Sequence, residues 1–378
     1  MKRIVGILWE KADSTWFYKD MCAYLYYLAK YYGWQAVLCY YPKGDLLENK
    51  EYEKSVTLKS LGYTESYNEQ LRIAKKFILH NSNDIDVIMM FNYGGNTYKL
   101  ANYVKKINPN ITIWSKLDMS ESGFSHFYDG TILRQLKNIV ELWKSRNVDI
   151  FTVENYTYYK TLKKLNVFKN RVEYLPNGVS VYDLDIDNLD SKDKENVIVY
   201  IGRLDAVEKN AELFLDALAK IDEDVLMKWE VRIIGPYAED IQNKYDAIVA
   251  KNNTFKNKVH LLGKITDRNI IYEICSRARI ICLTSLSESF GIAVIEGMYW
   301  GAYPIITNYG RIVEDITDNR KLGVVVDSND SCQYARALQS VMKSGVAQVV
   351  SQKCKDYVRT RFGDVNLTAK LNKILLNL

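Results

Sequence analysis

Two glutamates at the start of a predicted helix have the type and spacing needed to bind a charged, hydroxylated ligand. Glu288 lies in the loop after an apolar strand, and Glu296 lies in the second turn of the helix that follows. The first N–H groups of a helix have no partner within it and suit a phosphate or another anion. Here those groups lie near Ser289, Phe290, Gly291 and Ile292.

Carboxylates beside an anion site suit a ligand that carries both phosphates and hydroxyls. A nucleotide sugar offers a diphosphate to the N–H groups and ribose and hexose hydroxyls to the carboxylates. When a nucleoside diphosphate leaves a sugar, negative charge builds on the leaving oxygen, and a positioned cation stabilises it by roughly 3 kcal/mol. Arg203 and Lys209 are the candidate cations. The alternative is a solvated helix with two incidental glutamates and a surface charge pair.

Strand and helix candidates alternate along the chain in two series. An acidic stretch without periodicity, between residues 177 and 196, separates the two series. This pattern predicts an α/β protein with two doubly wound, Rossmann-like domains facing a central cleft, whose ligands bind beyond the carboxyl ends of the strands. The predicted strands are 4–8, 36–40, 86–91, 111–118, 149–153 and 171–175, then 197–201, 229–234, 259–262, 280–283, 304–307 and 323–326.

The segment 283–298, which reads Leu-Thr-Ser-Leu-Ser-Glu-Ser-Phe-Gly-Ile-Ala-Val-Ile-Glu-Gly-Met, resembles the family-4 retaining glycosyltransferases of GT-B fold. Residues 300–306 continue the likeness, and further pieces occur in the family's order over most of the chain. One departure is Ser180, which stands where the family often has Asp. The other matching pieces are 175–179, 202–204 with Lys209 and Asn210, Gly235, and 262–263.

The resemblance implies retaining, metal-independent transfer of a sugar from a UDP- or GDP-sugar to an acceptor hydroxyl. It implies a hexosyltransferase-type enzyme of bacterial surface-glycan or glycoconjugate synthesis, with no cofactor besides the nucleotide-sugar co-substrate. Glu288 would hold a donor-sugar hydroxyl and Glu296 the ribose hydroxyls. The nucleobase would lie by Leu262 and Gly263. The diphosphate would lie by Gly202, Arg203 and Lys209.

The resemblance also predicts the domain boundaries. Residues 1–180 would form an acceptor-binding N-terminal domain, 181–196 the interdomain connection, and 197–378 the nucleotide-sugar-binding domain. The last helix is a candidate to return to the N-terminal domain. The acceptor would be a glycan, a lipid-linked glycan or a glycoprotein.

The first domain departs from the family at the end of its fourth predicted strand. Where relatives often place a His-Asp pair, this chain has Lys116, Leu117 and Asp118. Asp118 is the candidate to position the acceptor hydroxyl or to take its proton. Lys116 would contribute charge or pair with Asp118, and His126 in the next loop would supply an imidazole from another direction. The residue that replaces the family histidine stays open among these three.

Composition bounds the setting of the protein. The 378 residues carry a net charge of +5 and contain no apolar run long enough to cross a bilayer, which favours a cytoplasmic protein. Residues 1–180 contain 25 Lys and Arg against 18 Asp and Glu, which suits a membrane surface or a diphosphate-bearing acceptor as well as an uneven solvated surface. The stretch 15–32 is predicted as a helix, and its many aromatic residues suit sugar stacking, a membrane interface or the core.

Other functional classes are disfavoured by the same residues. No recognisable nucleic-acid motif accompanies the basic charge, and no Gly-x-Gly-x-x-Gly follows an early strand. Three distant histidines and six scattered cysteines make a metal site unexpected, and Cys39, Cys275 and Cys282 are expected to be buried. A non-catalytic GT-B-like subunit, which binds a glycan or protein acceptor and supports a partner transferase, is the main alternative to an enzyme.

Overall fold

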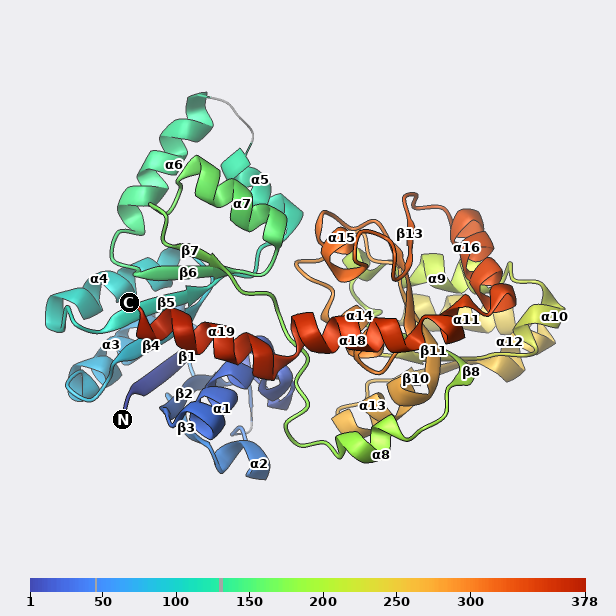
Figure 1. Ribbon diagram of the computed structural model, residues 1–378, viewed down its shortest axis with the longest axis horizontal. Helices are drawn as coiled ribbons and strands as arrows, with labels where there is room; N and C mark the ends of the chain where they lie inside the picture. Colours follow the sequence, from blue (N-terminus) through green and yellow to red (C-terminus); the bar gives the residue numbers. More distant parts are fainter. Residues whose placement is uncertain (45, 129–131) are drawn as a thin grey trace. The chain divides into compact units, whose positions relative to one another are not determined.

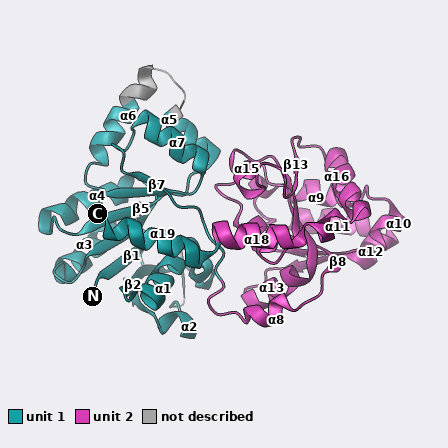
Figure 2. Ribbon diagram, in the orientation of Figure 1, with its two compact units in different colours: residues 1–180, 363–378 teal, residues 181–362 magenta. Residues whose placement is uncertain are grey.

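The computed structural model describes residues 1–44, 46–128 and 132–378. The chain divides into two compact units (Figure 2). Unit 1 comprises residues 1–180 and 363–378, and unit 2 comprises residues 181–362. Within the described ranges, no helix is both long and apolar enough to span a bilayer.

Unit 1 is built on a seven-stranded parallel sheet of order β3-β2-β1-β4-β5-β6-β7 (Figure 1). The chain order reverses between β1 and β4, which are hydrogen-bonded neighbours although two strands separate them in sequence. The strands are β1 (Arg3–Ala12), β2 (Gln35–Pro42), β3 (Val56–Ser60), β4 (Val87–Phe91), β5 (Thr112–Lys116), β6 (Ile150–Val153) and β7 (Val172–Tyr174).

Strand β3 was not predicted, because it lies in a charged stretch after β2. It is paired with β2 alone, at the edge of the sheet. Its side chains alternate between buried and exposed positions, beginning with buried Val56, and the exposed ones are polar. A half-exposed edge strand has no continuous apolar run, so the periodicity of a buried parallel strand is missing.

Helices and short 3-10 turns connect these strands. The helix predicted over the aromatic stretch 15–32 is interrupted at Lys19. The helical elements of unit 1 are η1 (Ser14–Tyr18), α1 (Asp20–Tyr32), α2 (Lys50–Glu53), α3 (Tyr67–Asn81), α4 (Gly95–Ile107), α5 (Glu121–Tyr128), α6 (Ile132–Lys144), α7 (Tyr156–Leu165) and α19 (Asp364–Leu376).

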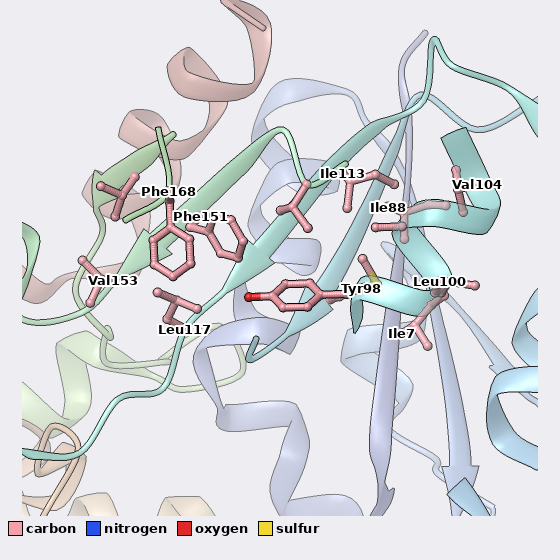
Figure 3. Close-up of a cluster of buried hydrophobic side chains, with 14 of the residues drawn as sticks. Ile7, Ile88, Tyr98, Leu100, Val104, Ile113, Leu117, Phe151, Val153 and Phe168 are labelled. Atoms are coloured by element: carbon pink, nitrogen blue, oxygen red, sulfur yellow. The ribbon is translucent and has the colours of Figure 1, made fainter. Parts of the chain in front are cut away.

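One face of the unit 1 sheet is covered by apolar side chains from both strands and helices (Figure 3). Ile7 and Ile88 from adjacent central strands meet Leu100 and Val104 of α4 in this cluster. Phe151 and Phe168 stack at 4.2 Å between ring centroids. Burial of each large apolar side chain contributes about 1.5–3 kcal/mol, so this layer fixes the strands whose ends carry the candidate site.

Unit 2 is built on a six-stranded parallel sheet of order β10-β9-β8-β11-β12-β13. Its chain order reverses between β8 and β11. The strands are β8 (Glu195–Ile201), β9 (Glu230–Ile234), β10 (Val259–Gly263), β11 (Ala278–Leu283), β12 (Tyr303–Thr307) and β13 (Val324–Val326). The prediction of two doubly wound, Rossmann-like parallel-sheet domains is therefore confirmed.

Helices lie on both faces of the unit 2 sheet (Figure 1). Cys39 of unit 1 and Cys275 and Cys282 of unit 2 are all buried, as predicted. The helical elements of unit 2 are α8 (Ile186–Asp190), η2 (Val207–Lys209), α9 (Ala211–Leu218), α10 (Glu223–Leu226), α11 (Glu239–Val249), α12 (Asn253–Lys258), α13 (Arg268–Arg277), α14 (Ile292–Tyr299), α15 (Ile312–Ile316), α16 (Ser331–Ser344), α17 (Val346–Val349) and α18 (Ser351–Phe362).

The segment predicted as an interdomain connection, 181–196, lies within unit 2. It contains α8, whose Asp190 accepts two hydrogen bonds from Arg359, at 2.6 and 2.7 Å, and pairs with Lys355 at 2.8 Å. Residues 363–378, within the range predicted for the second domain, belong to unit 1, and they contain the last helix, which was the candidate to return to the N-terminal domain. There α19 packs against α1, and Trp34 donates a hydrogen bond to Asn372 at 2.8 Å.

Candidate active site

The loops that follow β8 and β11 carry the residues predicted to bind a nucleotide sugar. These two strands are neighbours at the point where the strand order of unit 2 reverses. Connections leave such a point in opposite directions and open a crevice beyond the strand ends, where doubly wound sheets bind their ligands. Gly202 and Arg203 follow β8, and Glu288 follows β11.

Hydrogen bonds to backbone carbonyls hold these two loops together. The Leu286 N–H donates to the Glu208 carbonyl at 2.8 Å. The Thr284 hydroxyl donates to the Asn210 carbonyl at 2.9 Å, and the Tyr200 hydroxyl donates to the Lys209 carbonyl at 2.9 Å. The side chains carried by the two loops are therefore held at fixed positions relative to each other.

Lys209 and Glu288 form an ion pair at the centre of this region. Lys209 Nζ lies 2.6 Å from Glu288 Oε1, and the same oxygen accepts a hydrogen bond from the Ser285 hydroxyl at 2.6 Å. The side chains are 18% and 12% exposed, so both are shielded from bulk water but reachable by a ligand. A charge-assisted pair of this kind presents a positioned cation and a carboxylate to the same ligand.

Arg203 lies in the same loop but is much more open to solvent. Its side chain is 64% exposed and pairs with Glu208 at 2.7 Å. An exposed ion pair of this kind contributes little to stability, about 0–1 kcal/mol. The guanidinium can therefore leave Glu208 for a phosphate at small cost.

The start of helix α14 lies beside the Lys209–Glu288 pair in sequence and is shaped by Gly291. This residue is the N-cap of α14 with φ +91°, a left-handed conformation that favours glycine. A Cβ there would stand 2.5 Å from the Tyr309 hydroxyl oxygen. That hydroxyl is buried and has no hydrogen-bond partner among the described residues. Burial raises the pKa of Tyr309 well above its usual value, so the phenol keeps its proton and remains a donor.

The remaining residues predicted at this helix start have different surroundings. Phe290 is buried and packs edge-on against Phe362 at 5.5 Å between ring centroids, so it can offer a ligand only its backbone N–H. Ser289 and Ile292 are partly exposed. The first turn of α14 contains no acidic residue that would occupy the positive end of its dipole.

Glu296 faces helix α13 in the interior. It is 4% exposed, and its Oε1 accepts hydrogen bonds from Arg268 and from the Tyr272 hydroxyl, the latter at 3.0 Å. Sequence reasoning identified Glu296 but missed these two partners, because they lie on α13, more than twenty positions earlier. A ligand hydroxyl would therefore share Glu296 with Arg268 and Tyr272.

Glycines at the ends of β8, β9 and β10 come close together. The Gly202 N–H donates to the Ile234 carbonyl at 3.0 Å, and the Gly235 N–H donates to the Gly263 carbonyl at 2.9 Å. A Cβ on Gly235 would lie 1.6 Å from the Gly202 carbonyl oxygen, so no side chain fits there. Leu262 is exposed beside Gly263. The three glycines leave the backbone uncovered by side chains at the edge of the sheet where the nucleobase is predicted to bind.

In unit 1, Lys116, one of the three candidates to replace the family histidine, points into the core. Its side chain is fully buried, and Nζ donates to Asn177 Oδ1 at 2.7 Å and to the Leu117 carbonyl at 3.0 Å. Nζ also lies 3.1 Å from Asp20 and 3.9 Å from Glu154. Burial disfavours the ammonium, but Asp20 and Glu154 outweigh it and raise the pKa of Lys116.

Two buried carboxyl groups of unit 1, those of Glu154 and Asp364, have raised pKa values. Burial raises the pKa of Glu154 to about 8, although the Lys116 charge opposes the shift. Glu154 also accepts the Met119 N–H and so holds the loop that carries Asp118. Burial likewise raises the pKa of Asp364 to about 7, although a 2.8 Å hydrogen bond from Ser180 opposes it. These groups form an internal cluster at the carboxyl ends of the central strands.

The other two candidates in unit 1 lie closer to solvent. Asp118 follows β5 and is partly buried. Its charge contributes to the raised pKa of Lys116, whose ion pairs are with Asp20 and Glu154. His126 is exposed on α5, where its ring Nδ1 lies 2.9 Å from the Ser122 carbonyl of the same helix. The His126 imidazole is therefore engaged by its own helix.

A pocket of about 460 Å³ opens where β1 and β4 meet, at the point of strand-order reversal in unit 1. Trp9 has a buried indole N–H without a partner among the described residues. Lys19 lies 3.6 Å from the ring centroid of Trp16. Five of the residues that line the pocket are aromatic, and Gly94 and Gly95 at the start of α4 line it as well. The pocket is lined by Leu8, Trp9, Trp16, Tyr67, Asn68, Phe91, Asn92, Tyr93, Gly94, Gly95, Asn96, Thr97 and Lys99.

The described part of the chain contains no group of three or more His, Cys, Asp or Glu that could hold a metal ion. The groups present at the candidate site in unit 2 are a cation–carboxylate pair, a helix N-terminus and a buried phenol. Unit 1 offers an aromatic pocket with polar edges. Flat aromatic rings stack against apolar faces of sugar rings while polar groups bind their hydroxyls.

Residues 182–361 match the family model of glycosyl transferases group 1. This match covers nearly all of unit 2. The GalNAc-alpha-(1->4)-GalNAc-alpha-(1->3)-diNAcBac-PP-undecaprenol alpha-1,4-N-acetyl-D-galactosaminyltransferase of Campylobacter jejuni is 28% identical over 195 residues, covering 50% of this chain and 52% of that protein. The alpha-1,3/1,6-mannosyltransferase alg-2 of Neurospora crassa is 24% identical over 218 residues, covering 50% and 46%. The chain spans about half the length of the curated relatives it matches.

Solved structures resemble the whole chain. HepE of Anabaena in complex with UDP and glucose has a TM-score of 0.71 at 14% identity, with all of both chains covered. The lipopolysaccharide outer core galactosyltransferase WaaB has a TM-score of 0.65 at 15% identity, again with all of both chains covered. At such identities the likeness shows the fold, which is the GT-B fold of these glycosyltransferases.

Proposed function

From a group 1 domain in unit 2 and a GT-B fold, we propose that this protein is a glycosyltransferase of bacterial surface-glycan or glycoconjugate synthesis. It transfers a sugar from a nucleotide sugar to an acceptor hydroxyl, with retention of configuration and without a metal ion. The observation that carries the proposal is the Lys209–Glu288 pair, which lies at the strand-order reversal of the domain that matches the family.

The donor is a UDP- or GDP-sugar bound by unit 2. Lys209 and Arg203 neutralise the diphosphate, and the N–H groups at the start of α14 add donors for its oxygens. Glu288 accepts a hydroxyl of the donor sugar, and Glu296 accepts the ribose. UDP is favoured by HepE, which was solved with UDP and with UDP-glucose.

The charge that develops on the leaving group explains how this arrangement would catalyse the transfer. As the sugar–oxygen bond breaks, negative charge grows on the departing diphosphate, and Lys209 is already in place to stabilise it. Only interactions that strengthen at this stage raise the rate. Because Lys209 and Arg203 supply the positive charge, activity that persists in a chelator such as EDTA is expected.

The acceptor is a glycan, and we favour one carried on a lipid diphosphate. The pocket of unit 1 has aromatic walls for a sugar ring and polar groups for hydroxyls. Its Lys99 and the N-terminal end of α4 suit an anionic group on the same ligand. The name of the Campylobacter relative describes a glycan on undecaprenol diphosphate as its acceptor. Asp118, on the loop held by Glu154, positions the acceptor hydroxyl or takes its proton.

Thermal unfolding in the presence of nucleotides tests the donor assignment. UDP, GDP, UDP-sugars and GDP-sugars at about 100 times the dissociation constant should stabilise the fold by roughly 2.7 kcal/mol. The stabilisation by the preferred nucleotide should disappear in Glu288→Gln combined with Lys209→Ala. If no nucleotide changes the unfolding temperature, the donor site is refuted.

A non-catalytic subunit that binds a glycan or protein acceptor is the competing function. It is favoured by the engagement of Glu296 with Arg268, which occupies one oxygen expected for ribose. Such a subunit would bind an acceptor glycan without responding to nucleotides. Measurement of both ligands on the same preparation therefore separates the two functions.

A further inference from the structure

Helix α6 (Ile132–Lys144) turns apolar side chains toward solvent. Ile139 and Trp143 are 62% and 63% exposed, and Val140 is about half exposed. Residues spaced by three and four positions lie on the same face of a helix, so these three form one stripe. We call it the α6 stripe, defined as Ile139, Val140 and Trp143.

Described polar side chains of α6 turn the other way and contact the rest of unit 1. Asn138 donates to the Phe127 carbonyl at 3.2 Å, and Glu141 accepts a hydrogen bond from the Tyr98 hydroxyl. Ser145, just beyond the helix, is buried. This polarity is the reverse of that of an ordinary surface helix, whose apolar face meets the core. The α6 stripe therefore lacks the covering that a folded domain normally gives such a face.

The surroundings of the α6 stripe are strongly basic. Lys137, Lys144 and Arg146 are exposed on the same segment, and the Arg146 guanidinium lies 4.3 Å from the ring centroid of Trp143. Residues 132–171 contain nine Lys and Arg against three Asp and Glu, and one of those acids, Glu154, is buried. A tryptophan flanked by lysine and arginine is the composition found where helices lie in a membrane interface.

Helix α7 extends this basic surface. Figure 1 shows α5, α6 and α7 grouped at one side of unit 1, and α5 contacts both of the others. On α7, Lys160 lies 4.8 Å from the ring centroid of exposed Tyr156, and Lys164 is exposed near the end of the helix. The aromatic and basic character therefore continues beyond α6.

We propose that the α6 stripe inserts into the headgroup region of a membrane that contains anionic lipids. Apolar insertion and attraction of the flanking cations to lipid phosphates act together there. A second copy of the chain is a poorer occupant, because two such basic surfaces would repel each other. The aromatic stretch 15–32 of η1 and α1, the membrane candidate from the sequence, is mostly buried: Trp16, Phe17, Tyr24, Tyr26 and Tyr27 lie in the core. The proposal does not depend on the glycosyltransferase activity.

Vesicle binding by the full chain tests this surface. The protein is sedimented with vesicles of phosphatidylcholine alone and with about 30% phosphatidylglycerol, at low and high salt. Binding to anionic vesicles is expected, and it should weaken with salt. Ile139→Asp with Val140→Asp should reduce it at least about tenfold, because charge replaces two inserting side chains. Leu79→Asp, at an exposed apolar residue of α3 in the same unit, is the matched control and should bind as the wild type does.

Tryptophan fluorescence gives a second readout that does not require the double variant to fold. Trp143 is the exposed tryptophan of the chain, the other six being buried or partly buried. Anionic vesicles should shift its emission to shorter wavelength, and Trp143→Phe should remove this shift while keeping sedimentation. Failure of the wild type to bind anionic vesicles, or a shift that persists in Trp143→Phe, would overturn the proposal. So would a double variant that changes a dimer into a monomer while lipid binding is absent.

Discussion

Lys209 of unit 2 and Lys116 of unit 1 are both lysines near the end of a central strand, but their surroundings differ. Lys209 lies on a loop after β8, partly open, with one carboxylate partner. Lys116 ends β5, is fully buried, and has two carboxylates and two neutral oxygens around it. A lysine with a single partner can still bind a ligand. A lysine whose ammonium is surrounded by groups of the protein has no hydrogen-bond donor left for a ligand. Removal of the first should affect activity, and removal of groups around the second should affect stability.

The sharpest form of this contrast is Lys209→Ala. Loss of a positioned cation at the leaving group should lower kcat/KM by about 100-fold or more, since such groups contribute roughly 3 kcal/mol. The unfolding temperature should change little. Steady-state kinetics with the preferred nucleotide sugar and thermal unfolding measure the two effects.

A surface lysine in the same unit is the control for Lys209. Lys343 pairs with Asp222 at 2.9 Å, and both are about half exposed. Lys343→Ala should leave kinetics unchanged, because exposed pairs contribute little. If Lys209→Ala instead unfolds the protein and its remaining folded fraction is fully active, Lys209 serves the fold as Lys116 does.

In unit 1, Asp364→Asn should change the pH dependence of stability. The pKa of Asp364 is raised from 3.8 to about 7, so the folded protein holds this proton more tightly than the unfolded chain. The free energy of unfolding that this proton contributes therefore falls as the pH rises from about 4 to about 7, by about 1.4 kcal/mol per pH unit. Asparagine has no such proton, so the variant should gain roughly 2–3 kcal/mol relative to wild type between pH 5 and pH 8.

Denaturant unfolding at several pH values measures this difference. Ser180→Ala is the companion variant, because the Ser180 hydrogen bond holds the pKa of Asp364 down. Its loss should extend the fall in stability to higher pH. Parallel pH profiles for wild type and Asp364→Asn would mean that the cluster does not control stability.

Gly291→Ala tests whether the helix start in unit 2 is as specialised as the ion pair beside it. The residue has φ +91°, and a Cβ would clash with the Tyr309 hydroxyl. Backbone strain of this kind costs about 1–3 kcal/mol, and displacement of Tyr309 adds to it. Weaker nucleotide binding is expected by isothermal titration calorimetry.

Gly345→Ala separates strain from the clash. Gly345 has φ +70°, but nothing lies within 4 Å of the place where its Cβ would stand. It should lose stability without any loss of nucleotide affinity. Equal affinity in both variants would remove the start of α14 from the donor site.

The smallest effect is expected at the pocket of unit 1. Tyr67→Ala removes one ring of that pocket at an exposed position, so the fold should tolerate it. The KM for the acceptor should rise about two- to tenfold, since an aromatic contact contributes roughly 0.5–1.5 kcal/mol, while the donor KM stays constant. Tyr63→Ala, at a nearby exposed tyrosine outside the pocket, should change neither.

The same comparison explains what the sequence could predict. The candidate donor-side residues lie in short continuous segments after strands, so Lys209, Glu288 and Gly291 could be proposed from the sequence alone. The direction of Lys116 was not, because it is set by Asp20, Glu154 and Asn177, which come from distant parts of the chain. The hydrogen bond from Arg268 to Glu296 could not be predicted for the same reason.

Elements without a strong apolar pattern were also missed. Strand β3 alternates polar and buried positions at an edge, and the pocket of unit 1 joins residues of β1 with residues around β4. Periodicity shows that a helix has an apolar face but not which way that face turns. The α6 stripe was therefore visible only in the structure.

The return of residues 363–378 to unit 1 also sets an order for folding during protein synthesis. Unit 2 is one continuous segment, whereas unit 1 needs α19, made after all of unit 2. The bond between Ser180 and Asp364 joins residues 184 positions apart, and Asn372 reaches back to Trp34. Domains usually fold from the N-terminus as the ribosome advances. Here the middle of the chain can finish first, and the beginning waits for the last helix to emerge.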